Sequence, residues 1–112
     1  FYNFVQTLMP NVGSRPSPQD FRASCGAFRE VLACLRPTHV LVTGYTLWNN
    51  MPEWDGAHAE VVLGGTLRDV GEYRVDDWVS LAMCVPHLSR GFSAPRWAPV
   101  VDDFRRLTNV PI

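Results

Sequence analysis

Lysine is absent from this 112-residue chain, and all 10 of its basic side chains are arginine. The formal net charge is −1, so no overall positive field attracts nucleic acid, and any such contact has to be local. No apolar run is long enough to span a bilayer, and no charged start followed by an apolar stretch marks a signal peptide. We therefore expect no contact with a membrane and no globally basic surface.

Cysteine is also scarce, with three residues and no CxxC pair. Cys25 and Cys34 share a segment with helical spacing, and their separation puts them on opposite faces of a helix, too far apart for a disulfide. Reduced thiols are typical of a cytoplasmic protein, which is the location that we expect. The Cys and His residues form no cluster with the spacing of metal ligands, so we expect neither a metal nor an organic cofactor.

The remaining composition is that of an ordinary globular protein, with 46% hydrophobic and 19% charged residues, and the length predicts one domain. The chain begins at Phe1 in an apolar stretch without a methionine. We therefore interpret residues 1–112 as a single α/β domain that is a fragment of a longer protein. A preceding segment or a second copy of the chain is then a candidate partner.

The first half of the chain predicts a strand, a helix and a second strand. Residues 1–5 (FYNFV) are aromatic and apolar, as in a buried strand end, and a loop rich in Pro, Gly and Ser follows. Ser17 then caps a helix whose apolar face extends from Phe21 to Leu35. Residues 39–43 (HVLVT) form a largely apolar, β-branched run after a very short loop, which is typical of a strand in a parallel sheet.

In the second half, Thr46 is expected to cap a short helix. Residues 60–68, with a Gly-Gly pair near their centre, predict a hairpin, and we expect residues 72–77 to extend it as an exposed insertion. Residues 78–85 predict another buried strand, and Pro95 opens a final helix. This order predicts an α/β fold with three layers, a mostly parallel sheet between helices, and a small β-hairpin insertion.

Ligands of such sheets bind beyond the carboxyl ends of the strands, so polar residues that follow a predicted strand are candidate site residues. Asn3 carries an amide that matches the edge of a nucleobase, and Tyr2 beside it could stack on one. The alternative is an asparagine that bonds only to its own loop. Gly44 could let an anion approach the backbone, or it could simply allow close packing of the next helix.

The loop at residues 86–93 (PHLSRGFS) is the most informative segment. Backbone N–H groups there, together with Arg90, could hold a phosphate, and His87 could donate a hydrogen bond to an oxyanion. The alternative is a polar loop whose Ser93 only caps the helix. Cys84 and His87 could also form a nucleophile pair, although a core position for Cys84 is the simpler interpretation.

Three segments, in this order, resemble the uracil-DNA glycosylase superfamily. Residues 1–5 (FYNFV) are similar to the strand that ends in the asparagine that reads uracil, and residues 36–48 (RPTHVLVTGYTLW) are similar to a strand and turn of its bacterial branches. Residues 87–89 (HLS) stand where the family has its His-Pro-Ser loop, with Leu88 in place of proline. The resemblance covers most of the chain apart from the hairpin region. The Gly-rich first motif of the family would precede Phe1.

The resemblance implies the C-terminal portion of a domain that hydrolyses the N-glycosidic bond of a flipped base in DNA, and we expect the complete domain rather than this chain alone to be active. Asn3 would pair with the base, and His87 would stabilise the negative charge that develops on it. Ser89 and backbone amides would hold phosphate, and Leu88 or Arg90 would fill the gap in the duplex. The alternatives are a non-catalytic nucleic-acid or nucleotide binding module of the same fold and a structural or assembly fragment.

Overall fold

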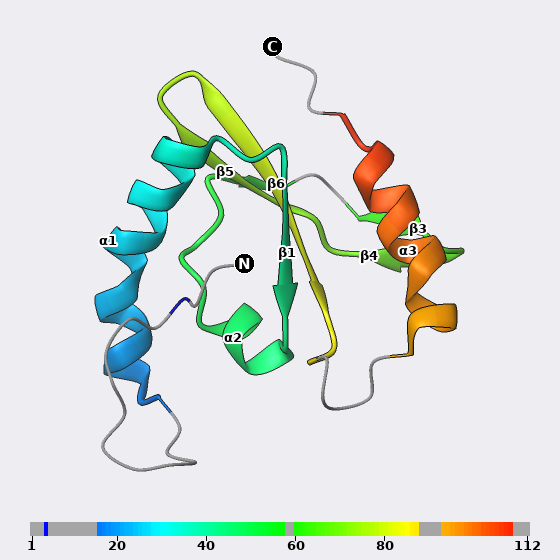
Figure 1. Cartoon of the computed structure of the whole chain (residues 1–112), viewed down its shortest axis with the longest axis horizontal. Coiled ribbons are helices and arrows are strands. Elements are labelled where there is room, and N and C mark those ends of the chain that lie inside the picture. The colour runs from blue at the N-terminus through cyan, green and yellow to red at the C-terminus, as the bar shows by residue number, and fades with distance from the viewer. Residues whose placement is uncertain (1–3, 5–15, 58–59, 88–92, 109–112) are drawn as a thin grey trace.

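The computed structural model describes residues 4, 16–57, 60–87 and 93–108. Helices and strands alternate irregularly along this part of the chain, and Figure 1 shows how they are arranged. The elements are α1 (Pro18–Leu35), β1 (His39–Thr43), α2 (Tyr45–Asn49), β2 (Gly56–Ala57), β3 (Val61–Leu63), β4 (Thr66–Arg68), β5 (Gly71–Val75), β6 (Trp78–Val85) and α3 (Ala94–Arg106). The predicted helices, the hairpin and the strands at residues 39–43 and 78–85 are thus confirmed, whereas β2 was not predicted and β5 was expected only as an extension of the hairpin. The strand predicted at residues 1–5 lies outside the described residues apart from Phe4.

The main sheet has the strand order β1-β6-β5-β2 and is mixed. β1 pairs with β6 in parallel, and β5 pairs in antiparallel fashion with both β6 and β2. The sequence predicted a mostly parallel sheet, whereas only the pairing of β1 with β6 is parallel among the described strands. It also predicted an exposed stretch at residues 72–77, of which Glu72 and Tyr73 are buried while Arg74, Asp76 and Asp77 are exposed. Only Asp76 and Asp77 separate β5 from β6. A link of two residues can join antiparallel strands, but it is too short to connect parallel ones. Asp76 adopts a positive φ of 54°, which aspartate tolerates better than most residues.

Helix α1 is defined at both ends by local chemistry. The hydroxyl of Ser17 accepts a hydrogen bond from the N–H of Asp20, and the Asp20 carboxylate accepts one from the N–H of Ser17, which completes a capping box. The helix ends at Arg36, which adopts a left-handed conformation (φ 44°) before Pro37. The buried face includes Phe21, as predicted, but Leu35 is 72% exposed because it occupies the last helical position.

The hairpin of β3 and β4 forms a separate two-stranded sheet, as the sequence predicted. Gly64 and Gly65 make its turn with φ values of 58° and 83°, a backbone conformation that favours glycine. The N–H of Gly64 donates a hydrogen bond of 2.8 Å to Oδ2 of Asp103 in α3. The hairpin is therefore fastened to α3 rather than projecting freely from the domain.

Helices cover both faces of the main sheet. Figure 1 shows α1 on one face, and α3 with the β3–β4 hairpin on the other. Residues of β6 alternate between two buried clusters, so this strand is covered on both sides. The cluster toward α3 contains Leu63, Val70, Leu81, Met83, Val85, Trp97, Val100 and Phe104. The cluster toward α1 contains Phe4, Phe21, Phe28, Leu32, Tyr73 and Ala82.

None of the described helices is both long enough and apolar enough to cross a membrane.

Candidate functional site

β1 and β6 end at the same edge of the sheet, and the residues that follow them meet there. The parallel register of the two strands extends to Thr43 opposite Val85. The N–H of Gly44 continues this ladder by donating a hydrogen bond of 2.8 Å to the carbonyl of Val85. The carboxyl ends of neighbouring parallel strands are where α/β sheets bind ligands. Two of the predicted site residues, Gly44 and His87, are therefore brought together by the fold.

Gly44 packs directly against His87 and also begins α2. A Cβ atom added to Gly44 would lie 3.7 Å from Cδ2 of His87. Gly44 adopts φ 104° and ψ 131° as the N-cap of α2, and side chains rarely tolerate this conformation. The prediction that Thr46 caps this helix is wrong, because the glycine conformation starts α2 already at Tyr45. Thr46 instead lies inside the helix, where its carbonyl accepts a hydrogen bond from the side chain of Asn50 (2.7 Å).

His87 has an exposed side chain that follows the buried end of β6. Its predicted companions Tyr2, Asn3, Leu88, Ser89 and Arg90 lie outside the described residues, so their roles stay predictions. Ser93 directly precedes α3, and within the described chain its hydroxyl makes no capping hydrogen bond to that helix. The alternative interpretation, in which Ser93 only caps the helix, would require this hydrogen bond and is therefore not supported.

Cys84 carries a protonated thiol rather than a nucleophile at neutral pH. Burial raises the pKa of Cys84 to about 11, and the backbone N–H of Gly44 only partly offsets this effect. The thiol donates a weak hydrogen bond to the carbonyl of Val85 at 3.5 Å. A raised pKa disfavours the thiolate that nucleophilic catalysis requires. The raised pKa of Cys84 argues against a nucleophile pair with His87, although the side chain is half-buried and lines the pocket described below rather than lying in the core.

The second described histidine, His39, is a packing residue at the opposite end of β1. Its ring stands edge-on to Phe104 with the centroids 5.0 Å apart, and its Nε2 lies 2.8 Å from the carbonyl of Leu107. In residues 4, 16–57, 60–87 and 93–108, no three side chains of His, Cys, Asp or Glu gather as a metal site. His39 is thus separate from the rim that Gly44 and His87 form beyond the carboxyl ends of β1 and β6.

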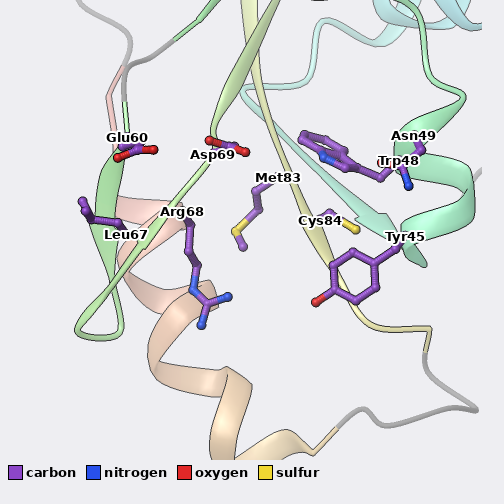
Figure 2. A pocket seen from close by; sticks show the side chains of 9 residues that line it. All are labelled: Tyr45, Trp48, Asn49, Glu60, Leu67, Arg68, Asp69, Met83 and Cys84. Carbon is purple, nitrogen blue, oxygen red and sulfur yellow. The ribbon is translucent and has the colours of Figure 1, made fainter.

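An open pocket of about 440 Å³ lies next to this rim, beside the last part of β6 (Figure 2). The ladder between β5 and β6 starts at the pair of Gly71 and Ala82, so among the described strands Met83 and Cys84 have only β1 as a neighbour. The pocket lies along this unpaired edge of β6, beyond the start of β5. Its lining residues are Tyr45, Trp48, Asn49, Glu60, Leu67, Arg68, Asp69, Met83 and Cys84.

The sequence carries no signal for this pocket. Its lining comes from three separate segments, and the sequence predicted only a short helix, an exposed hairpin and a buried strand for them. The pocket exists because the ladder with β5 reaches only to Ala82 and leaves the last residues of β6 unpaired on that side, and the extent of this ladder depends on tertiary packing rather than on a local pattern. Both polar and aromatic side chains line the pocket beside this sheet edge.

No family model matches the chain, and neither a curated protein nor a solved structure matches it.

Proposed function

We propose that this chain is the C-terminal portion of a uracil-DNA-glycosylase-like domain that binds a flipped base in DNA and, in the complete protein, hydrolyses its N-glycosidic bond. The observation that carries the proposal is the contact between Gly44 and His87 beyond the parallel strands β1 and β6. The two residues are far apart in the sequence, and the resemblance assigns both of them to one site. The three free cysteines fit the cytoplasmic location that such a protein would have.

The arrangement of the described elements supports a three-layer version of this fold. α1 and α3 cover opposite faces of the sheet, and β1 and β6 are parallel (Figure 1). Within the described residues β1 is the edge of the sheet, so it can accept another strand. We propose that further parallel strands, among them the one predicted at residues 1–5, complete a mostly parallel sheet on this side.

The proposed chemistry rests on hydrogen bonding to a leaving group. Breaking the glycosidic bond places negative charge on the departing base, and a fixed donor in a dry pocket lowers that barrier. The exposed imidazole of His87 can supply this donor once the base has displaced water from the rim. Asn3 would pair with the base, Ser89 and backbone amides would hold phosphate, and Leu88 or Arg90 would occupy the gap in the duplex.

One observation favours a non-catalytic module with the same rim. The described residues that directly follow β1 and β6 contribute no carboxylate that could activate water. A protein of this kind would bind the base without releasing it. The two functions therefore differ in a single measurable step.

The test is an assay of the full-length protein on single- and double-stranded oligonucleotides that contain uracil, with matched thymine oligonucleotides as the reference. We measure base release and, by fluorescence anisotropy, binding. His87→Ala is expected to lower base release by about 10²–10³ while uracil binding persists, and Asn3→Ala is expected to reduce the preference for uracil. His39→Gln is the control, because it removes an imidazole at the opposite end of β1.

Full activity of the His87→Ala variant would remove the proposed role of that residue. Binding without base release by the unaltered protein would establish the non-catalytic module instead. If neither His87→Ala nor Asn3→Ala changes binding or release, the rim is not a base site and the chain is a structural fragment.

A further inference from the structure

Two carboxylates stand opposite one another at the open end of the β3–β4 hairpin. The last described pair of this ladder is Val61 opposite Arg68, so Glu60 and Asp69 are the next residues on the two strands. Both are exposed, and both line the pocket beside β6. Like charges that face each other across antiparallel strands destabilise the pair, and a cation placed between them removes this repulsion.

The one arginine that lines the pocket is engaged elsewhere. The guanidinium of Arg68 lies over the ring of Trp97, 4.5 Å from its centroid, and its Nε donates to the carbonyl of Leu63 at 3.4 Å. Figure 2 shows its side chain pointing away from Glu60 and Asp69. The hairpin side of the pocket therefore keeps a negative character.

Two aromatic rings line the α2 side of the same pocket. Figure 2 shows Tyr45 and Trp48 across from the carboxylates. Trp48 is held in place by Trp54, with the ring centroids 5.4 Å apart, and Trp54 in turn lies against Gly71, where any side chain would collide with it. Tyr45 is 53% exposed and open to contact. Aromatic faces attract cations, especially planar ones that can stack.

We propose that this pocket binds a planar organic cation of the amidinium or guanidinium type. The charged end lies between Glu60 and Asp69, and the flat face lies against Trp48 and Tyr45. The volume of about 440 Å³ falls in the range of small-ligand sites. The site is separate from the rim of Gly44 and His87, and it does not depend on the glycosylase proposal.

The experiment is an NMR titration of the chain with benzamidine, a planar ring that carries an amidinium. Benzamide is the neutral comparison of nearly the same shape, and benzoate is the anionic one. We expect benzamidine to shift the signals of Tyr45 and the Trp48 indole, and benzamide to bind about tenfold more weakly or worse. Arginine amide is titrated as the second cation. Comparing its affinity with that of benzamidine shows whether the site prefers a ring-bearing small molecule or an arginine side chain.

Variants locate the charge that is responsible. Glu60→Gln and Asp69→Asn are each expected to weaken benzamidine binding about tenfold. Neither is expected to lower the midpoint of thermal unfolding, because both side chains are exposed and their mutual repulsion is relieved. Glu30→Gln is the matched control, since it removes the same charge from an exposed position on α1.

Equal binding of benzamide and benzamidine would overturn the proposal, and so would unchanged affinity in both pocket variants. Signal shifts confined to residues outside the pocket would also overturn it. Failure of the glycosylase assay would leave this result unaffected, because the two sites involve different residues.

Discussion

The backbone of Gly44 lies against the imidazole of His87, and a Cβ on Gly44 would stand 3.7 Å from Cδ2 of that ring. This is an ordinary contact distance, so His87 by itself would permit alanine at this position. The glycine is required by its φ of 104°, which starts α2 immediately after β1. The backbone conformation of Gly44 therefore lets α2 begin directly after β1, beside His87.

Gly44→Ala is expected to destabilise the protein by about 1–3 kcal/mol, the usual cost of placing a side chain in a disfavoured backbone region. Urea denaturation measures the change. Gly26→Ala is the matched control, because Gly26 lies inside α1 with no atom within 4 Å of an added Cβ. That change is expected to stabilise the protein by about 0.5–1 kcal/mol. Equal effects at the two positions would contradict the conformational argument.

Asp55 connects α1 to β5 and makes part of the stability depend on pH. Its carboxylate accepts hydrogen bonds from Nη1 of Arg29 (2.9 Å) and from the N–H of Arg74 (2.7 Å). Burial alone would raise the pKa of Asp55, but these bonds bring it below the ordinary value of 3.8. The unfolded state therefore binds the proton more tightly, so this stabilisation is present above pH 3.8 and is lost as the pH falls through the lowered pKa.

At neutral pH, Asp55→Asn is accordingly expected to lower the free energy of unfolding by about 1 kcal/mol or less. Once the pH lies below the lowered pKa of Asp55, the substitution is expected to have no effect. Denaturation of both proteins over this pH range measures the difference. Asp77→Asn removes a carboxylate that is 88% exposed and controls for the loss of one charge. A gap between Asp55→Asn and the unaltered protein that stayed constant with pH would disprove the linkage.

The cysteine thiols are expected to be alkylated in an order set by their exposure and by the fraction of each that is ionised. Cys34 is exposed, so iodoacetamide should modify it first. Burial raises the pKa of Cys84 from 9.0 to about 11, so its thiolate is roughly 100-fold scarcer than that of an ordinary cysteine at neutral pH. Mass spectrometry of the alkylated peptides gives the order. Modification of Cys84 before Cys34 would show that Cys84 is activated after all.

The same shift in the pKa of Cys84 makes stability fall in alkaline solution. The unfolded thiol ionises near its ordinary pKa of 9.0, whereas the folded thiol keeps its proton until about pH 11. Above pH 9.0 the unfolded state therefore binds fewer protons, and the contribution of Cys84 is lost as the pH rises through this interval. Cys84→Ala should reduce the alkaline loss.

Local chemistry made much of the fold predictable. Ser17 and Asp20 cap α1 through bonds three residues apart, and the Gly-Gly pair turns the hairpin through its own φ values. The strand at residues 78–85 was predicted at its observed bounds because all of its residues except Ser80 are apolar. The errors have two causes. The start of α2 depends on the backbone conformation of Gly44, and the burial of residues within 72–77 depends on a neighbouring element. Residues 72–77 have a mixed pattern, yet Tyr73 is fully buried because α1 covers it.

The sequence by itself determined α1, α3, the hairpin, the strands at residues 39–43 and 78–85 and which polar residues follow β1 and β6, because caps, turns and hydrophobic periodicity act over a few residues. Only the tertiary structure decided that β5 enters the main sheet and pairs with β6 as far as Ala82, that Gly44 meets His87, and that Glu60 and Asp69 face Tyr45 and Trp48 across a pocket. These arrangements depend on which surfaces bury one another, and burial is a property of pairs of elements rather than of any one segment.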